Sequence, residues 1–269
     1  MNARHPVRSF ALPVAVLLFG VGVLAQSAQE PFTPKVGLPG KDVVWVPTPQ
    51  SLVDKMLDMA RVTSQDYVID LGSGDGITVL SAAKRGAMAL GIEYNPDLVE
   101  LSKRKAEAEG LTGRASFVKA DIFESDFSRA TVVTMFLLPD LNLRLRPILL
   151  DLKPGTRIVS NTWDMEDWES DDKVTSGDEC QSWCTALLWI VPAQVQGAWQ
   201  MPQGELRLGQ YFQKIAGTLG STPISEGRLR GNVITFRFGG AQYTGVVDGN
   251  EMRGTVTGGS GGTWSATRR

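Results

Sequence analysis

Acids and glycines at regular spacing are the residues of this sequence best suited to chemistry. Gly72, Gly74 and Gly76 stand at alternate positions, and the first of them is two residues past Asp70. Glycine lets the backbone take unusual conformations and pass close to a ligand. Glu93 ends an apolar run 17 residues past Gly76. Open α/β sheets bind ligands outside the carboxyl ends of their strands, so the pattern predicts a ligand site that includes the Glu93 carboxylate.

The residues on either side of the glycines predict a strand, a turn and a helix. Tyr67–Leu71 is a short apolar run rich in β-formers, and Ile77–Arg85 is helical up to a glycine cap at Gly86. This is the first unit of a nucleotide-binding βαβ fold. The dinucleotide fingerprint G-x-G-x-x-G needs glycine at position 77, where Ile77 stands. A nicotinamide-dependent oxidoreductase is therefore disfavoured, and a purely structural glycine turn is a further alternative.

The stretch Asp70–Gly76, Asp-Leu-Gly-Ser-Gly-Asp-Gly, resembles the first motif of class I S-adenosylmethionine (SAM) methyltransferases. The resemblance implies a methyltransferase with SAM as its cofactor, and an acid at Asp70 suits the cationic methionine end of SAM. The cofactor-binding residues it implies in this loop are Asp70, Gly72, Ser73, Gly74 and Gly76.

Further cofactor contacts follow from the same resemblance. Glu93 would hold the ribose hydroxyls, Asp121 would accept from the adenine amino group, and Ile122 would lie against the ring. Thr48 ends Trp45-Val-Pro-Thr48, which resembles the segment that covers SAM in a narrower set. That set comprises exported bacterial methyltransferase-like proteins and, more distantly, mitochondrial protein-lysine methyltransferases acting on an ATP synthase component or adenine nucleotide translocase. The resemblance covers roughly Val43–Thr162.

Two residues are expected to act on the methyl acceptor. Family members that methylate nitrogen often place a proline-containing turn after the fourth strand, and here that turn precedes Asp140. Asp140 could hold a lysine ammonium and help to remove its proton. Asn161 ends the fifth predicted strand, near the expected acceptor. The acidic stretch Asp164–Asp172 either attracts a lysine-bearing or other cationic acceptor or is a solvated loop.

Strands and helices alternate over residues 43–192, which predicts a Rossmann-like α/β domain with a mostly parallel sheet and helices on both faces. From about Gln194 the sequence becomes rich in glycine, and apolar and polar residues alternate between turn signals such as Asp248-Gly249. Residues 193–269 are therefore expected to form a small antiparallel β domain, a barrel or a sandwich. The strands predicted there are Leu206–Phe212, Asn232–Phe238, Gln242–Val247 and Glu251–Thr257.

The N-terminal sequence has the pattern of an export signal. Basic residues up to Arg8 precede the apolar run Phe10–Ala25, so residues 1–25 are predicted to be a cleaved leader and residues 26–42 a linker. An uncleaved membrane anchor is the alternative, as is an apolar N-terminus without export function. Cleavage would remove His5, the only histidine, and with it any histidine triad or histidine-ligated zinc.

Export places the protein in the periplasm or outside the cell, with membrane contact only through an uncleaved leader. Three residues separate Cys180 from Cys184, and either a disulfide or two free thiols fits this spacing. No metal site is expected. A net charge of −2 and the lack of a long basic run argue against a nucleic-acid partner.

The leading hypothesis is an active SAM-dependent methyltransferase, and a protein lysine is one candidate for its methyl acceptor. The alternative is a non-catalytic exported binding protein, in which a retired methyltransferase fold carries a ligand-binding β domain. The alternative arises because SAM is made in the cytosol, whereas the leader points outward.

Overall fold

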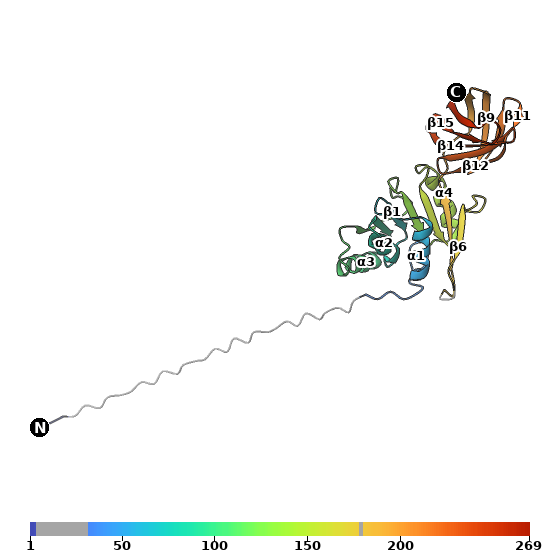
Figure 1. Cartoon of the computed structure of the whole chain (residues 1–269). Coiled ribbons are helices and arrows are strands. Elements are labelled where there is room, and N and C mark those ends of the chain that lie inside the picture. The colour runs from blue at the N-terminus through green and yellow to red at the C-terminus, as the bar shows by residue number, and fades with distance from the viewer. Residues whose placement is uncertain (4–31, 178–179) are drawn as a thin grey trace. The chain divides into compact units, whose positions relative to one another are not determined.

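The computed structural model describes residues 1–3, 32–177 and 180–269. Residues 4–25 of the predicted leader and the first part of the predicted linker lie outside the described residues. The chain from Thr33 to Arg269 forms one compact unit (Figure 1). None of the helices in the described part of the chain has the length and apolar character needed to cross a membrane.

The first sheet of the described residues has seven strands in the order β3-β2-β1-β4-β5-β7-β6. Strands β1 to β5 run parallel, whereas β7 is antiparallel to both β5 and β6. The strands are β1 (Tyr67–Leu71), β2 (Met88–Glu93), β3 (Ala115–Lys119), β4 (Val132–Met135), β5 (Arg157–Asn161), β6 (Asp172–Thr175) and β7 (Thr185–Ile190). The mostly parallel sheet confirms the predicted α/β class.

Helices cover both faces of this sheet, as predicted. Successive strand residues point to opposite faces, and Val68 and Ile69 accordingly belong to two different core clusters. The cluster around Val68 contains residues of α1 (Gln50–Met59), α2 (Ile77–Lys84) and α3 (Pro96–Ala108), and the cluster around Ile69 contains residues of α4 (Pro139–Leu150).

The second sheet of the described residues is a closed antiparallel barrel. Its strands follow the order β10-β12-β13-β14-β15-β16-β8-β9, and a further pairing of β9 with β10 closes the ring. Closure leaves no free edge and decides between the barrel and the sandwich. The strands are β8 (Gly197–Met201), β9 (Gly204–Tyr211), β10 (Lys214–Leu219), β11 (Thr222–Pro223), β12 (Ser225–Arg230), β13 (Val233–Phe238), β14 (Ala241–Asp248), β15 (Glu251–Thr257) and β16 (Gly262–Arg268).

Aromatic side chains fill the barrel. Phe236 stacks on Tyr243 with ring centroids 4.8 Å apart, and Trp264 meets Phe236 edge-on at 5.5 Å. Ile234 and Phe236 are buried, as the alternation predicts, whereas Phe238 is only partly buried. Trp199 is buried as well, and its indole Nε1 donates to the Val195 carbonyl at 2.8 Å.

The predicted acidic stretch Asp164–Asp172 makes contacts within the chain rather than lying free. Asp171 pairs with Arg228 of β12 at 2.8 Å, and Glu169 pairs with Lys214 of β10 at 2.7 Å. Asp167 contacts Arg146 and Tyr211. Part of the stretch thus joins the α/β part to the barrel, so its charge is not all available to a cationic acceptor.

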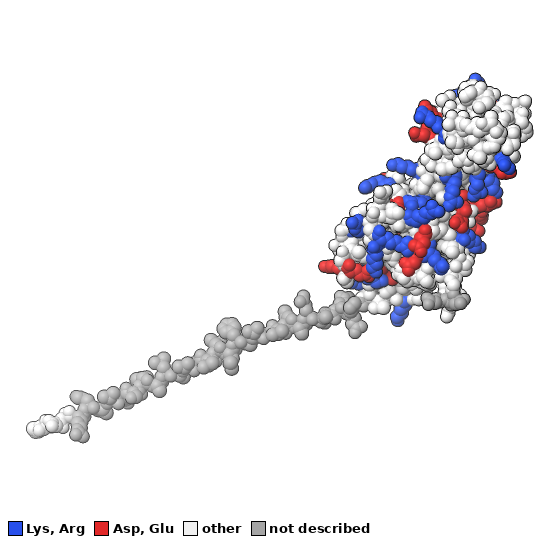
Figure 2. All heavy atoms as spheres, in the orientation of Figure 1, with Lys and Arg blue, Asp and Glu red and all other residues white. Residues whose placement is uncertain are grey.

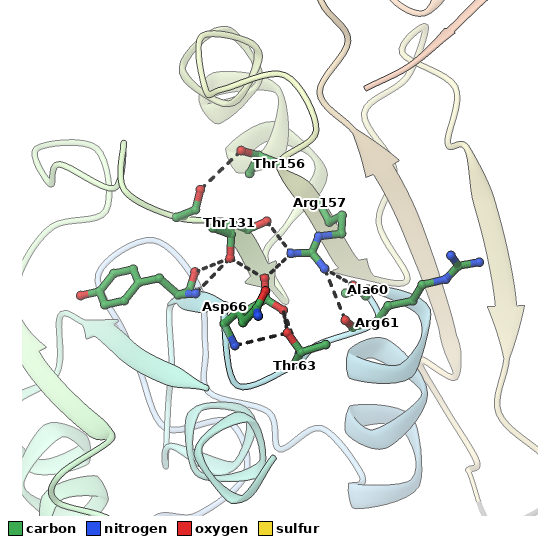
Figure 3. Close-up of polar contacts among 10 residues, drawn as sticks. Ala60, Arg61, Thr63, Asp66, Thr131, Thr156 and Arg157 are labelled. Carbon is green, nitrogen blue, oxygen red and sulfur yellow. Dashed lines mark hydrogen bonds and ion pairs between the residues drawn. The ribbon is translucent and has the colours of Figure 1, made fainter. Parts of the chain in front are cut away.

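A polar network fixes the amino ends of the central strands (Figure 3). Asp66 precedes β1 and pairs with Arg157, the first residue of β5. Asp66 also accepts hydrogen bonds of 2.8 Å from Thr131 Oγ1 and from the Thr63 amide. Burial alone would raise the pKa of Asp66, but these hydrogen bonds and Arg157 outweigh burial and hold the pKa below its ordinary value. The network lies at the edge of the sheet where the parallel strands begin.

Candidate active site

A cavity of about 260 Å³ opens at the carboxyl ends of the parallel strands. The chain runs from β1 outward to β2 and β3, then returns to the other side of β1 as β4. Open α/β sheets bind ligands at such a reversal of strand order. The lining residues follow the strand order across this edge, from Asp121 after β3 to Trp183 before β7.

The glycine loop after β1 forms the floor of the cavity. Gly72 and Gly74 line it with φ angles of 75° and 52°, which L-residues with side chains rarely adopt. A Cβ atom at Gly74 would lie 2.6 Å from Trp45 Nε1. Gly76 lies outside the lining, where a Cβ atom would meet Ser102 Oγ at 2.8 Å. Gly76 therefore permits helix packing, while Gly72 and Gly74 shape the cavity.

Ser73 lines the cavity between these two glycines. Its hydroxyl Oγ is buried and has no hydrogen-bond partner among the described residues. Buried hydroxyl groups normally have a partner. The free hydroxyl is thus available to a bound cofactor.

Asp70 lies beneath the loop, almost fully buried at 6% exposure. Burial raises the pKa of its carboxyl group to about 7; a hydrogen bond from Thr134 opposes the rise, and the charges of Glu93 and Asp75 add to it. A nearby cation would restore the ionised form. This is the electrostatic environment that suits a positively charged group of a ligand.

Glu93 ends β2 and faces the same cavity. Its Oε2 accepts from the Gly74 amide at 2.9 Å, and its Oε1 accepts from the Asn95 amide at 2.8 Å. Each carboxylate oxygen can accept a second hydrogen bond. The backbone therefore holds Glu93 in place and leaves both oxygens able to receive ligand hydroxyls.

Asp121 and Ile122 line the cavity at its β3 end. Asp121 pairs with Lys41, and it accepts from the Phe123 amide at 2.9 Å. The Lys41 side chain, followed by the Phe123 amide, lowers the pKa of Asp121. Lys41 belongs to residues 37–48, here called the strap, which lines the cavity from Leu38 to Thr48. A backbone bridge between Leu38 and Trp45 folds the strap back on itself.

Thr48 and Asn161 meet at the other end of the strap. Thr48 is buried and lines the cavity, and the Asn161 amide donates to Thr48 Oγ1 at 3.4 Å. Asn161 itself is fully buried behind Thr48 and is not among the lining residues. Asp140 also lies outside the lining, exposed in the first turn of α4, where an acid is favoured by the helix dipole.

The part of the cavity beyond β4 is apolar. Its lining residues are Met135, Phe136, Leu137, Leu138, Leu141, Trp163 and Trp183. Trp163 follows Thr162, a β-branched residue at a φ of 64°, so the chain turns sharply where β5 ends. The Trp163 carbonyl accepts from Ser160 Oγ at 2.7 Å and from Asn142 Nδ2 at 3.0 Å.

Sequence reasoning missed Lys41, Phe136 and Trp183 as lining residues. The sequence shows that Phe136 and Trp183 are aromatic, but no pattern near Trp183 predicts that it reaches the cavity. The β6–β7 hairpin, which was not predicted as a hairpin, brings Trp183 to the strand ends.

Comparison with known proteins agrees with this geometry. The sequence model of the ANTKMT methyltransferase domain matches residues 70–172, a match that ends before the barrel. The chain is 44% identical over 139 residues to a protein-lysine N-methyltransferase of Saccharolobus islandicus, covering 51% of this chain and 86% of that protein. The chain belongs to the class I SAM-dependent methyltransferases.

Two further relatives of this methyltransferase differ in the acceptor that their names give. A human lysine N-methyltransferase, whose name gives a component of ATP synthase as its substrate, is 32% identical over 166 residues, covering 60% of this chain and 69% of the relative. A crystal structure of an RNA methyltransferase from Salinibacter ruber with S-adenosylhomocysteine (SAH) is 43% identical, with a TM-score of 0.52. That match covers 56% of this chain and 96% of the other.

These relatives confirm the predicted methyltransferase with SAM as its cofactor, and they favour it over the non-catalytic binding protein. The cavity fits SAM on its own geometry, since it combines a glycine floor, an unpartnered serine hydroxyl and the carboxylates Asp70 and Glu93. Of the predicted cofactor-binding residues, Gly76 is not part of the lining. The lining ones are Thr48, Asp70, Gly72, Ser73, Gly74, Glu93, Asp121 and Ile122.

Proposed function

We propose that this enzyme methylates a lysine side chain of a protein and does so outside the cytoplasm. The observation that carries the lysine assignment is the apolar half of the cavity, beyond β4, where every lining residue lacks a charge. Relatives from an archaeon and from human are named as lysine methyltransferases.

The apolar walls bear on the protonation state of the acceptor. A lysine amine attacks only in its neutral form, and an apolar environment lowers the pKa of a lysine by disfavouring the ammonium. Residues such as Phe136 and Trp163 therefore favour the reactive amine once its stem is enclosed. Asp140, exposed at the start of α4, would contact the lysine ammonium before the side chain enters the cavity. It would not contact the nitrogen during the methyl transfer.

The polar half of the cavity would hold the cofactor. In this assignment Glu93 accepts from the ribose hydroxyls, Asp121 accepts from the adenine amino group, and Asp70 faces the methionine ammonium. SAM, when bound, supplies an electrophilic methyl group on a sulfonium. The protein's part is to hold the amine in line behind that methyl group, which accounts for much of the rate of such a transfer.

Protein is favoured over RNA as the acceptor, although the Salinibacter ruber relative is named an RNA methyltransferase. RNA binding rests largely on contacts between basic side chains and phosphates. This chain carries a net charge of −2. Acidic and basic side chains are interspersed over the α/β part on the face shown in Figure 2. This surface lacks the basic field that a polyanion requires.

Location outside the cytoplasm is supported by two features. The sequence begins with a basic segment followed by an apolar run, the pattern of an export signal. Cys180 and Cys184 form a disulfide, a bond that persists in oxidising compartments. Fractionation of cells expressing the full chain with a C-terminal tag tests the location, and recovery in the cytosol with an intact N-terminus would contradict it.

The acceptor is tested with methyl-labelled SAM. The purified protein is incubated separately with envelope proteins and with total RNA, and the products are analysed by mass spectrometry for methyl-lysine and for methylated bases. We expect methyl-lysine in a defined protein, lost with Gly74→Val and retained with Gly113→Val, since a side chain at Gly113 meets no neighbour. Label confined to RNA would overturn the lysine assignment.

A further inference from the structure

The connection from β6 to β7 carries a disulfide beside the apolar half of the cavity. Cys180 and Cys184 are bonded, with their Cα atoms 5.6 Å apart. The Cys184 carbonyl accepts from the Ser176 amide at 2.7 Å, which ties the end of the loop to the hairpin. Trp183 stands directly before Cys184. The disulfide and this backbone bond thus fix the chain on the C-terminal side of Trp183.

The indole of Trp183 is part of the cavity wall although it is 44% exposed. Its ring centroid lies 6.1 Å from that of Phe136, with the ring planes tilted by 56°. Trp183 has a φ of 55°, a conformation that is uncommon for a bulky residue and needs support from its surroundings. The cross-link to Cys180 provides such a constraint.

We propose that Trp183, held by the Cys180–Cys184 disulfide, forms with Phe136 the outer wall of the acceptor channel and selects an unbranched aliphatic stem that ends in an amine. This inference rests on the proposed lysine methylation and names the residues that determine its specificity. Trp183 acts as a positioning residue for the acceptor and takes no part in the proton or methyl transfer.

The strand order separates this wall from the cofactor. Glu93 and Asp121 lie at the ends of β2 and β3, on one side of β1, whereas Phe136 and Trp183 follow β4 and precede β7 on the other side. An adenosine held by the two acids occupies the first side. The second side is then left for the acceptor, so a change at Trp183 should leave cofactor affinity intact.

The ring geometry favours a stem over a nucleobase. A base held by two aromatic side chains stacks on parallel faces, and the Phe136 and Trp183 rings are tilted and in contact. Tilted rings offer an apolar trough along which methylene groups can lie. Aromatic faces also attract an ammonium at the entrance, so the same wall suits the charged form outside and the neutral form inside.

The test uses two cofactor analogues that need no identified protein substrate. In both, a tertiary nitrogen replaces the sulfonium of SAM; one carries a methyl group, and the other carries a 2-(butylamino)ethyl arm, whose amine and butyl chain represent the lysine amine and its stem. Affinities of these analogues and of SAH are measured by calorimetry for the full chain and its variants. The wild type should bind the armed analogue about tenfold more tightly than the methyl analogue.

Trp183→Ala should remove this tenfold gain, Trp183→Phe should keep most of it, and Cys180→Ser with Cys184→Ser should reduce it several-fold. All three should bind SAH with unchanged affinity. Met88→Ala is the matched control, because Met88 is also 44% exposed but lies at the amino end of β2, away from the cavity at the carboxyl ends of the strands. This variant should keep the full gain.

The proposal would be overturned by no gain from the arm in the wild type, or by the same gain in Trp183→Ala. Loss of SAH binding in Trp183→Ala would also overturn it, because Trp183 would then support the cofactor or the fold. The labelling of envelope protein and RNA tests the lysine proposal independently of the analogue affinities. If the armed analogue binds tightly while only RNA is labelled, the proposed channel is supported and the proposal of a protein acceptor is wrong.

Discussion

Thr134 Oγ1 donates a hydrogen bond of 2.6 Å to Asp70 Oδ1, and both side chains are buried. The two residues are register partners on β1 and β4, the strands that flank the reversal of strand order. Thr134 is a neutral partner for a carboxylate that burial keeps close to neutrality, with a pKa of about 7. The affinity of the site for a cation should therefore depend on pH within the physiological range.

We predict that SAH binds more tightly as the pH rises from 6 to 7.5. Asp70 is mostly protonated at pH 6 and must lose its proton to face the methionine ammonium, so affinity should rise roughly eightfold over this range. Calorimetry across the range, in buffers of matched ionic strength, measures the slope. Asp70→Asn should bind more weakly at pH 7.5 and lose most of the slope; parallel curves for the two proteins would assign the titration to another group.

The same carboxyl group should make the ligand-free protein less stable as the pH rises. Its folded pKa of about 7 lies above the ordinary value of 3.8, so its favourable contribution is complete below pH 3.8 and is lost as pH rises through 7. Asp70→Asn, which can still accept from Thr134, should raise the free energy of unfolding at pH 8 by up to about 4 kcal/mol. Urea unfolding at pH 5 and pH 8 measures the difference, which should shrink at pH 5.

A side chain at Gly74 should abolish cofactor binding without unfolding the protein. Gly74→Val places a β-branched residue at a φ of 52° and brings its Cβ to 2.6 Å from the indole of Trp45. SAH affinity should fall at least tenfold, because the valine side chain and the displaced indole occupy cavity space, whereas the strained backbone lowers the free energy of unfolding by roughly 1–3 kcal/mol. Gly113→Val is the control, since no atom lies within 4 Å of a Cβ there. Equal SAH affinity in the two variants would show that the loop does not contact the cofactor.

The sequence was sufficient to predict most residues that line the polar half of the cavity because its signals are local. Asp70, Gly72 and Gly74 stand close together in the sequence, Glu93 ends β2, and Asp121 follows β3. In a parallel sheet the ends of such strands meet at one edge, so short-range patterns specify a long-range arrangement.

The apolar half of the cavity could not be predicted in the same way. Trp183 reaches the cavity through the antiparallel pairing of β6 and β7, and β6 is a short, largely exposed strand without clear alternation. The contacts of the acidic stretch could not be predicted either, because its partners Lys214 and Arg228 lie in the barrel, more than 40 residues along the chain. Charge alone does not reveal a partner so distant in the sequence.

The network around Asp66 should stabilise the fold without affecting the cofactor. Asp66→Asn loses the pairing with Arg157 at the amino ends of β1 and β5, and we expect the free energy of unfolding to fall by about 2–3 kcal/mol at pH 7. SAH affinity should not change. Asp58→Asn is the control, because Asp58 pairs with Arg85 at 71% exposure and should have little effect.

The pH dependence of this effect has a definite sign. The folded pKa of Asp66 lies below its ordinary value of 3.8, so its contribution is present above that pH and is lost as pH falls through the folded pKa. The stabilities of the wild type and Asp66→Asn should converge in acid. A difference that persists well below pH 3 would point to packing rather than charge as the origin of the effect.

Two ion pairs between the α/β part and the barrel should differ in strength because their carboxylates differ in burial. The Asp171 side chain is fully buried and is held by Arg228 and by the Ile190 amide at 2.9 Å, whereas the Glu169 side chain is 63% exposed beside Lys214. Arg228→Ala leaves a buried carboxylate without its cation and should lower the free energy of unfolding by about 1–3 kcal/mol. Lys214→Ala should produce no measurable change, because an exposed pair is screened by solvent. Urea unfolding followed by tryptophan fluorescence compares the two variants, and equal losses would show that burial of Asp171 does not govern how the two sheets are joined.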